Sequence, residues 1–108
     1  MMSIRKVKKL KVGAVHYAVE RRPVPITELD NGNVVGRTHY DAGKLLVSDA
    51  LCEETESLTI LHEALHALFW HAGNREHDER LIEALSGLLL DFIRDNPHYI
   101  KAVQSQKH

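Results

Sequence analysis

The feature that most restricts the fold is the apolar run over residues 58–70, which lies between an acidic cluster and a Gly-Asn pair. The cluster of three glutamates at positions 53–56 suits the start of a helix, where the backbone dipole favours negative charge. Gly73 followed by Asn74 is typical of a helix C-terminus. We therefore predict a long helix over residues 54–71, and the rest of the chain must supply the surface that covers it.

Two histidines, His62 and His66, lie four residues apart within this helix, and Glu63 follows the first. At about 100° per residue the two imidazoles are separated by only about 40° and point the same way. His71 falls about 180° from His62, so it is excluded as their partner on this helix.

The same projection predicts which side of the helix faces the core. Four apolar side chains fall between about 60° and 120° on one side of His62, and we expect that side to be buried. Glu63 falls about 100° to the other side, so it is expected to look away from the core toward a cleft. The four apolar residues are Leu61, Leu65, Leu68 and Ala72.

The pattern His-Glu-x-x-His on a helix is a zinc-binding motif of peptidases. Two neutral imidazoles bind Zn²⁺, and a third protein ligand leaves one position for water. The carboxylate beside them takes the proton of that water and passes it to the leaving amine. The same letters also arise by chance on amphipathic helices, but the helical setting favours the metal. We predict His62 and His66 as ligands of a Zn²⁺ cofactor and Glu63 as the general base.

A second helix, predicted over residues 78–94 with Asp78 as its N-cap, supplies candidates for the third ligand. Glu83 is favoured because it lies within a helix that is apolar nearly all round, where an unpaired charge is costly. Glu79 is the competing candidate, although a carboxylate near a helix start has an ordinary structural reason to be there. His77, in the connecting loop, is a further option.

The first half of the chain predicts strands. Residues 10–20 alternate apolar and polar side chains, which indicates one strand. Residues 34–40 and Lys44–Ser48 predict two more, joined by a short hairpin connection. Between the first strand and this hairpin we expect a turn of helix at residues 26–29 and a loop at residues 30–33.

The order strand, hairpin, helix, helix predicts an α+β fold with a small, mostly antiparallel three-stranded sheet packed on the two helices. With 108 residues the chain has material for one modest core, so we predict a single domain over residues 1–108. The tail over residues 98–108 is expected to hold one short helical turn.

Composition argues against several classes of partner. A net charge of −1 gives no overall attraction to nucleic acid or membrane, and no apolar segment reaches the length of a membrane span. We interpret the basic run over residues 5–11 as a solvated lead-in to the first strand rather than a nucleic-acid arm. Cys52, the single cysteine, excludes an internal disulfide, and no secretory signal pattern is visible, so a cytoplasmic location is expected.

The two predicted helices resemble a known family. LTILHEALHALF followed by ERLIEALSGLLLDFI is similar to the gluzincin pattern, in which a His-Glu-x-x-His helix precedes a helix that supplies a glutamate ligand. EALSG resembles the matching segment of thermolysin-like enzymes, except that Gly87 replaces an aspartate that supports a metal-binding histidine. Another acceptor for a histidine N–H would then be needed. The layout of strands before the motif also resembles ImmA/IrrE-type metallopeptidases and small zinc-peptidase-like proteins of phages and prophages, without their ANxF-type second helix.

The resemblance implies an endopeptidase that hydrolyses peptide bonds of a protein or peptide substrate. In such folds the strand before the active-site helix lies along the cleft as an edge, and the substrate pairs with it. Lys44–Ser48 would play that part. His39, Tyr40 and His77 are candidates for oxyanion stabilisation on their chemistry alone.

Two other functions remain compatible with the sequence. The first is a non-catalytic, zinc-containing module that binds a phage or host protein. The second is a nucleic-acid-associated factor resembling a truncated SprT-like protease, which rests on the basic run over residues 5–11 alone. The sequence indicates neither the substrate nor the oligomeric state.

Overall fold

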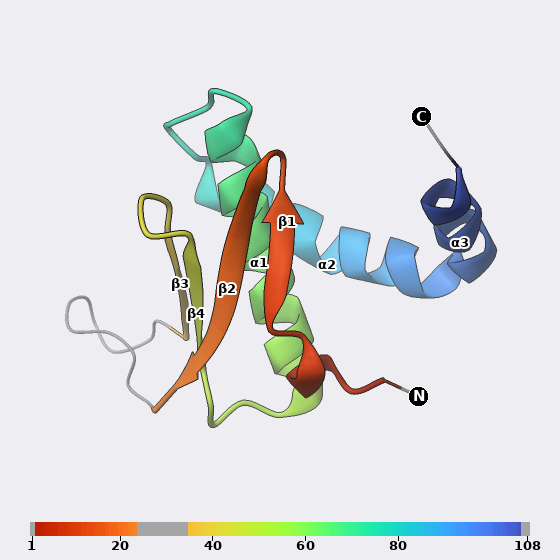
Figure 1. The fold of residues 1–108 in the computed structure, drawn as a ribbon, viewed down its shortest axis with the longest axis horizontal. Coiled ribbons are helices and arrows are strands. Elements are labelled where there is room, and N and C mark those ends of the chain that lie inside the picture. Colours follow the sequence, from red (N-terminus) through yellow and green to blue (C-terminus); the bar gives the residue numbers. More distant parts are fainter. Residues whose placement is uncertain (1, 24–34, 107–108) are drawn as a thin grey trace.

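A four-stranded sheet and a long helix that crosses one of its faces form the body of the protein in the computed structural model (Figure 1). The structure describes residues 2–23 and 35–106. After a 3₁₀ turn at Ile4–Lys6, the strands are β1 (Lys9–Val12), β2 (Val15–Arg22), β3 (Gly36–His39) and β4 (Lys44–Ser48), and the helices are α1 (Glu53–His71), α2 (Glu79–Asp95) and α3 (Pro97–Ser105).

The α+β class is confirmed, but the sheet differs from the prediction because residues 10–20 do not form one strand. Val12 pairs with Val15, which leaves Gly13 and Ala14 as a tight hairpin loop between β1 and β2. Gly13 has a φ of +59°, and no other type of residue has a positive φ in the described chain. Only the first central residue is therefore left-handed, as in a type II′ turn, whose twist suits a two-residue hairpin.

The sheet has the order β1-β2-β4-β3 and is mixed. β4 pairs antiparallel with β3, as the predicted hairpin requires, and also pairs parallel with β2. The predicted three-stranded sheet is thus corrected to four strands with one parallel pair. The turn of helix predicted at residues 26–29 and the loop at residues 30–33 lie outside the described residues.

One face of the sheet packs on α1. Tyr17, Leu45 and Val47 are fully buried on this face, whereas the side chains that alternate with them on β2 lie toward solvent. Val19 and Val47 contact Ile60, one of the buried side chains of α1.

The buried side of α1 is not the predicted one. Leu65 is buried, but Leu68 is 45 % exposed and Ala72 is exposed. The residues against the sheet instead lie about 60–160° from His62 on the other side, and all of them except Ile60 are small or polar. Apolar residues surround most of this helix, so periodicity alone does not select a face, and small side chains let helix and sheet approach closely. The side chains buried on that side are Glu56, Thr59, Ile60, Glu63 and Ala67.

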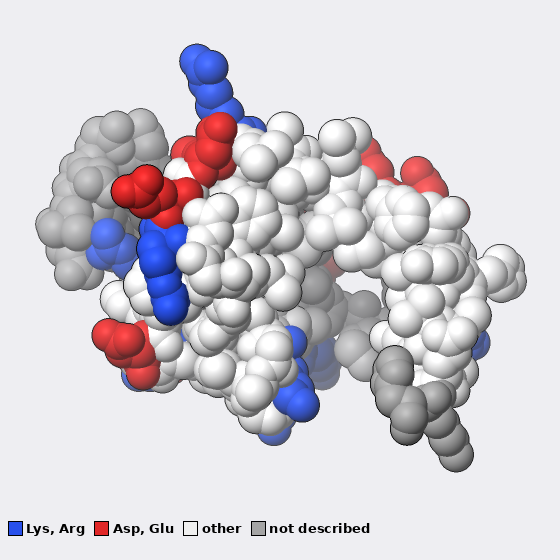
Figure 2. All heavy atoms as spheres, turned by 90° about the horizontal axis from the view of Figure 1, so that it is seen from above, with Lys and Arg blue, Asp and Glu red and all other residues white. Residues whose placement is uncertain are grey.

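The second and third helices form an arm beside the body. Predicted over residues 78–94, α2 runs over Glu79–Asp95, and Asp78 is its N-cap: its side chain accepts from the backbone N–H groups of the next turn. The tail is longer than the predicted single turn, because α3 has nine residues and begins at Pro97. α3 contacts α2 and no other described element, and it stands apart from the body (Figure 2). No helix in the described chain is both long and apolar enough to cross a membrane.

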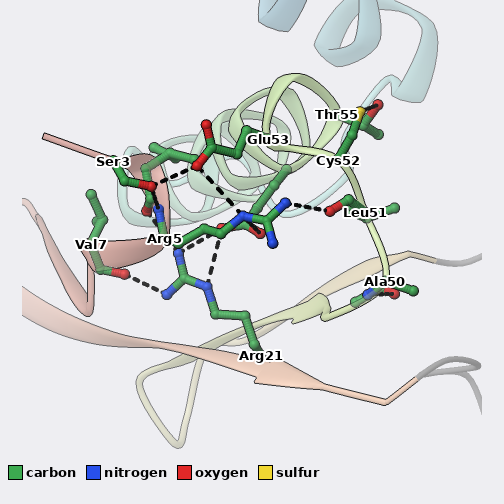
Figure 3. Close-up of polar contacts among 12 residues, drawn as sticks. Ser3, Arg5, Val7, Arg21, Ala50, Leu51, Cys52, Glu53 and Thr55 are labelled. Carbon is green, nitrogen blue, oxygen red and sulfur yellow. Dashed lines mark hydrogen bonds and ion pairs between the residues drawn. The ribbon is translucent and has the colours of Figure 1, made fainter. Parts of the chain in front are cut away.

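A buried ion pair fixes the start of α1 against the sheet and the N-terminal turn (Figure 3). Arg21 of β2 donates to Glu56 of α1 at 2.9 Å, and the exposed fraction of the Glu56 side chain is only 2 %. The same guanidinium donates to the backbone oxygens of Ile4 and Val7. Three segments of the chain are therefore joined by one arginine.

Candidate metal centre

His62 and His66 of α1 meet the first residue of α2. Nε2 of His62 lies 2.6 Å from Oε1 of Glu79, and Nε2 of His66 lies 3.1 Å from Oε2 of the same carboxylate. These ligand atoms all lie within 4.8 Å of one another. The two histidines converge as the helical spacing predicts, and their partner comes from the neighbouring helix.

The carboxylate in this group is Glu79, the competing candidate, and not Glu83, which the sequence favoured. Glu83 lies one turn further along α2, where it is exposed and lines the adjacent cleft. The burial argument for Glu83 does not hold, because α2 buries only Ile82 and Ser86. The N-cap at Asp78 sets where α2 begins and so brings Glu79 against the two imidazoles.

For neutral imidazoles, a chain of hydrogen bonds behind His66 indicates which of its two nitrogens carries the proton. Nε2 of His77 lies 2.7 Å from the backbone oxygen of Asn74, so this nitrogen must donate. With the ring neutral, Nδ1 of His77 is an acceptor, and it lies 2.7 Å from Nδ1 of His66. Nδ1 of His66 therefore donates, and its Nε2 carries the lone pair that faces Glu79. His77, a further option for the third ligand, instead forms a hydrogen bond with His66, a predicted ligand.

This donor set fits a divalent metal. With His66 neutral, its Nε2 lone pair and the carboxylate of Glu79 are two acceptors 3.1 Å apart, an arrangement that a cation between them would stabilise. Two imidazole nitrogens and one carboxylate oxygen are the His₂Glu ligands of catalytic zinc sites. The hydrogen bond from His66 to His77 is the outer support that metal-binding histidines usually have.

Glu63 lies beside this group, but it faces the sheet and not open solvent. Its exposed fraction is 8 %, and the hydroxyl of Thr38 on β3 donates to Oε1 at 2.7 Å. The prediction that Glu63 looks away from the core is therefore wrong, although the carboxylate does line the clefts described below. Burial raises the pKa of the Glu63 carboxyl above its ordinary value, and the Thr38 hydroxyl acts in the opposite direction.

Gly36 permits this approach of β3 to α1. A Cβ at Gly36 would lie 2.6 Å from Cγ2 of Thr59 and 3.1 Å from Cγ of Glu63. Only glycine leaves room for both side chains. Gly36 and Thr38 could not be predicted as site residues, because nothing in the strand pattern of the sequence shows which strand lies beside the motif.

Among the described strands, the edge strand beside the candidate metal centre is β3, since β4 is paired on both sides. The prediction that Lys44–Ser48 is the exposed edge is therefore wrong. The backbone N–H of Ser48 donates to the oxygen of Val35, and antiparallel pairing alternates along the strand. The backbone groups of Gly36 and Thr38 consequently point away from β4, toward the side of β3 that pairs with no other described strand.

Two hollows flank the metal centre. One, of about 360 Å³, extends toward α2 and includes Leu58, Glu83 and Ser86 in its lining. The other, of about 410 Å³, extends toward the hairpin and includes Arg37 and Tyr40. Both are lined by Gly36, Glu63 and Glu79, so they form two sides of one groove along the edge of β3.

Of the three oxyanion candidates, Tyr40 lines this groove. The ring of Tyr40 stacks on the ring of Trp70 with centroids 4.2 Å apart. The guanidinium of Arg75 lies 4.0 Å from the centroid of the Trp70 ring. Burial, followed by the charge of Glu63, raises the pKa of the Tyr40 phenol, so it stays a hydroxyl that can donate. His39 is exposed at the end of β3, and His71 contacts the Tyr17 hydroxyl on the sheet side.

Comparison of the chain with protein-family models, with curated proteins and with solved structures found no match.

Proposed function

We propose that the protein is a zinc-dependent endopeptidase in which His62, His66 and Glu79 bind the metal and Glu63 is the general base. The observation that carries the proposal is the convergence of two Nε2 atoms and one carboxylate beside a second, buried carboxylate. A bound Zn²⁺ supplies Lewis acidity, which makes water nucleophilic near neutral pH. The endopeptidase activity and the cytoplasmic location both still rest on sequence pattern.

The residues of this chain divide the remaining tasks. Glu63, held by Thr38, accepts the proton of the attacking water and returns it to the leaving amine. The outward backbone groups of Gly36 and Thr38 pair with an extended peptide, which places the scissile bond beside the metal centre. The hollows on either side of the centre hold the flanking side chains. Tyr40 is the donor in the groove for oxyanion stabilisation.

The test is Glu63→Gln in the zinc-loaded full chain, assayed on a mixed library of internally quenched peptides. We expect cleavage to fall by about 10²- to 10⁴-fold, the usual contribution of a general base, while bound zinc is unchanged. Glu54→Gln, an exposed change on the same helix, serves as the control and should keep full activity. Full activity of Glu63→Gln would refute the assignment.

A second measurement separates the enzyme from a non-catalytic zinc module. A catalytic metal keeps an open position, whereas a structural one is closed. Acetohydroxamate added to the cobalt-substituted protein should therefore change its visible spectrum. An unchanged spectrum, together with no cleavage of the peptide library by the wild-type chain, would favour the binding module.

A further inference from the structure

α2 carries more apolar surface than the body covers. Ile82 and Ser86 are buried, whereas Leu81 and Phe92 are nearly half exposed and Leu88 is 68 % exposed. At about 100° per residue, these exposed side chains lie together on a side that is turned away from the buried pair. The arm accordingly shows mostly uncharged surface in Figure 2.

The exposed side chains have the spacing of a helix-packing seam. Leu81, the half-buried Leu85, Leu88 and Phe92 follow one another at intervals of four, three and four residues. This is the a/d spacing that inserts side chains between those of a facing helix. The seam continues to α3, because the ring of Phe92 packs edge-on against Tyr99 at 5.9 Å between centroids. The surface therefore fits another helix with the same spacing.

The charges beside the seam indicate that the facing helix is α2 of a second copy of the chain. Arg80 near the start of α2 and Asp91 and Asp95 near its end lie within about 60° of one another around the helix axis, on one flank of the seam. None of the three takes part in an ion pair with a described residue. When a helix packs antiparallel on a copy of itself about a two-fold axis, each flank faces the same flank of the other copy. Opposite charges at the two ends of one flank then meet.

We propose that two copies of the chain associate through the seam Leu81–Leu85–Leu88–Phe92, with their α2 helices antiparallel. Leu85 then faces Leu88 of the second copy, and Leu81 faces Phe92 of the second copy. At this register, Arg80 lies between Asp91 and Asp95 of the second copy. The site at Glu79 lies on another side of α2, so the dimer leaves the metal centre open and does not depend on the proposed activity.

Sedimentation equilibrium of the full chain, free of metal, over about a hundredfold range of concentration tests the proposal, because self-association depends on concentration. We expect the mass to rise to twice that of one chain. Leu88→Glu should weaken association by about tenfold or more, as for a central interface residue. Its side chain is exposed in the single copy, so folding, checked by circular dichroism, is retained. His16→Glu places the same charge on the exposed side of β2 and should leave association unchanged.

A charge exchange tests the antiparallel arrangement itself. Arg80→Asp should weaken the dimer, and Arg80→Asp combined with Asp91→Arg should restore it, because both residues occur on every copy. Both changes suit the helix dipole, so neither alone harms α2. A wild-type chain that stays single at every concentration, a dimer unaffected by Leu88→Glu, or a failure of the second change to restore association would overturn the proposal.

Discussion

At the scale of single residues, the position of Glu63, the proposed general base, depends on the absence of a side chain at Gly36. Gly36→Ala would place a Cβ 2.6 Å from Cγ2 of Thr59, closer than such atoms approach in folded proteins. β3 or α1 must then shift, and Glu63 shifts with them. We expect the free energy of unfolding, measured with urea, to fall by about 1–3 kcal/mol, the usual cost of overpacking.

The steric clash between a Cβ at position 36 and Cγ2 of Thr59 can also be relieved by a change at Thr59. Thr59→Ser removes Cγ2 and keeps the hydroxyl, so the pair Gly36→Ala with Thr59→Ser should recover part of the lost stability. Thr59→Ser alone provides the baseline for this double-mutant comparison. Strictly additive effects of the two changes would show that the alanine does not contact Thr59.

The residues of the site differ in how far the sequence predicts them. The convergence of His62 and His66 follows from their spacing on one helix, because local geometry decides how two side chains on that helix project relative to each other. The direction of Glu63 was predicted wrongly, since it depends on which side of α1 packs on the sheet. Glu79 and Glu83 are one turn apart, so choosing between them requires the packing of α2 on α1, which is not a local property. Thr38 carries no signal at all in the sequence, since its partner lies on a different element.

At the scale of elements, the buried pair between Arg21 and Glu56 holds the start of α1. Glu56→Gln would leave the guanidinium of Arg21 mostly buried without its charged partner. Losing one member of a buried pair costs about 3–5 kcal/mol, and we expect a loss toward the lower end, because Arg21 keeps its bonds to two backbone oxygens. The loss in the free energy of unfolding is measured by urea denaturation.

Glu54→Gln is the matched control for this prediction. Glu54 also belongs to α1, and its carboxylate pairs with Arg94 of α2. Both side chains are exposed, so water replaces the lost contact. A similar loss of stability in both variants would mean that the effect comes from the helix terminus and not from burial of the pair.

Elements were predictable where their signals are local. The bounds of α1 and α2 follow from caps and turn residues, and β3 and β4 follow from alternation on either side of the connection that contains Gly43. The hairpin at Gly13 was missed although the apolar positions shift there, from Leu10 and Val12 to Val15, Tyr17 and Val19. The reversal at Gly13 and Ala14 pairs Val12 with Val15 and keeps these side chains on one face of the sheet. The central position of β4 depends on pairing with β2, which is distant in the chain.

At the scale of the whole molecule, the candidate metal centre lies where the body meets the arm. Its histidines belong to α1 and its carboxylate to α2, so a bound ion would act as a cross-link between the two helices. A ligand that binds only the folded chain stabilises it by about 2.7 kcal/mol at one hundred times its dissociation constant. For a domain of this size such a gain corresponds to a rise in melting temperature on the order of 10 °C.

The stabilisation by a bound metal can be used to test whether Glu79 or Glu83 is the third ligand. Addition of Zn²⁺ to the metal-free wild-type chain should raise the melting temperature, measured by calorimetry. Glu79→Gln should remove most of the rise, because two histidines alone hold the ion weakly and no longer tie α2 to α1. Glu83→Gln makes the same chemical change one turn along α2 and should keep the full rise. The opposite result would assign the third ligand to Glu83 and require α2 to turn about its axis when the metal binds.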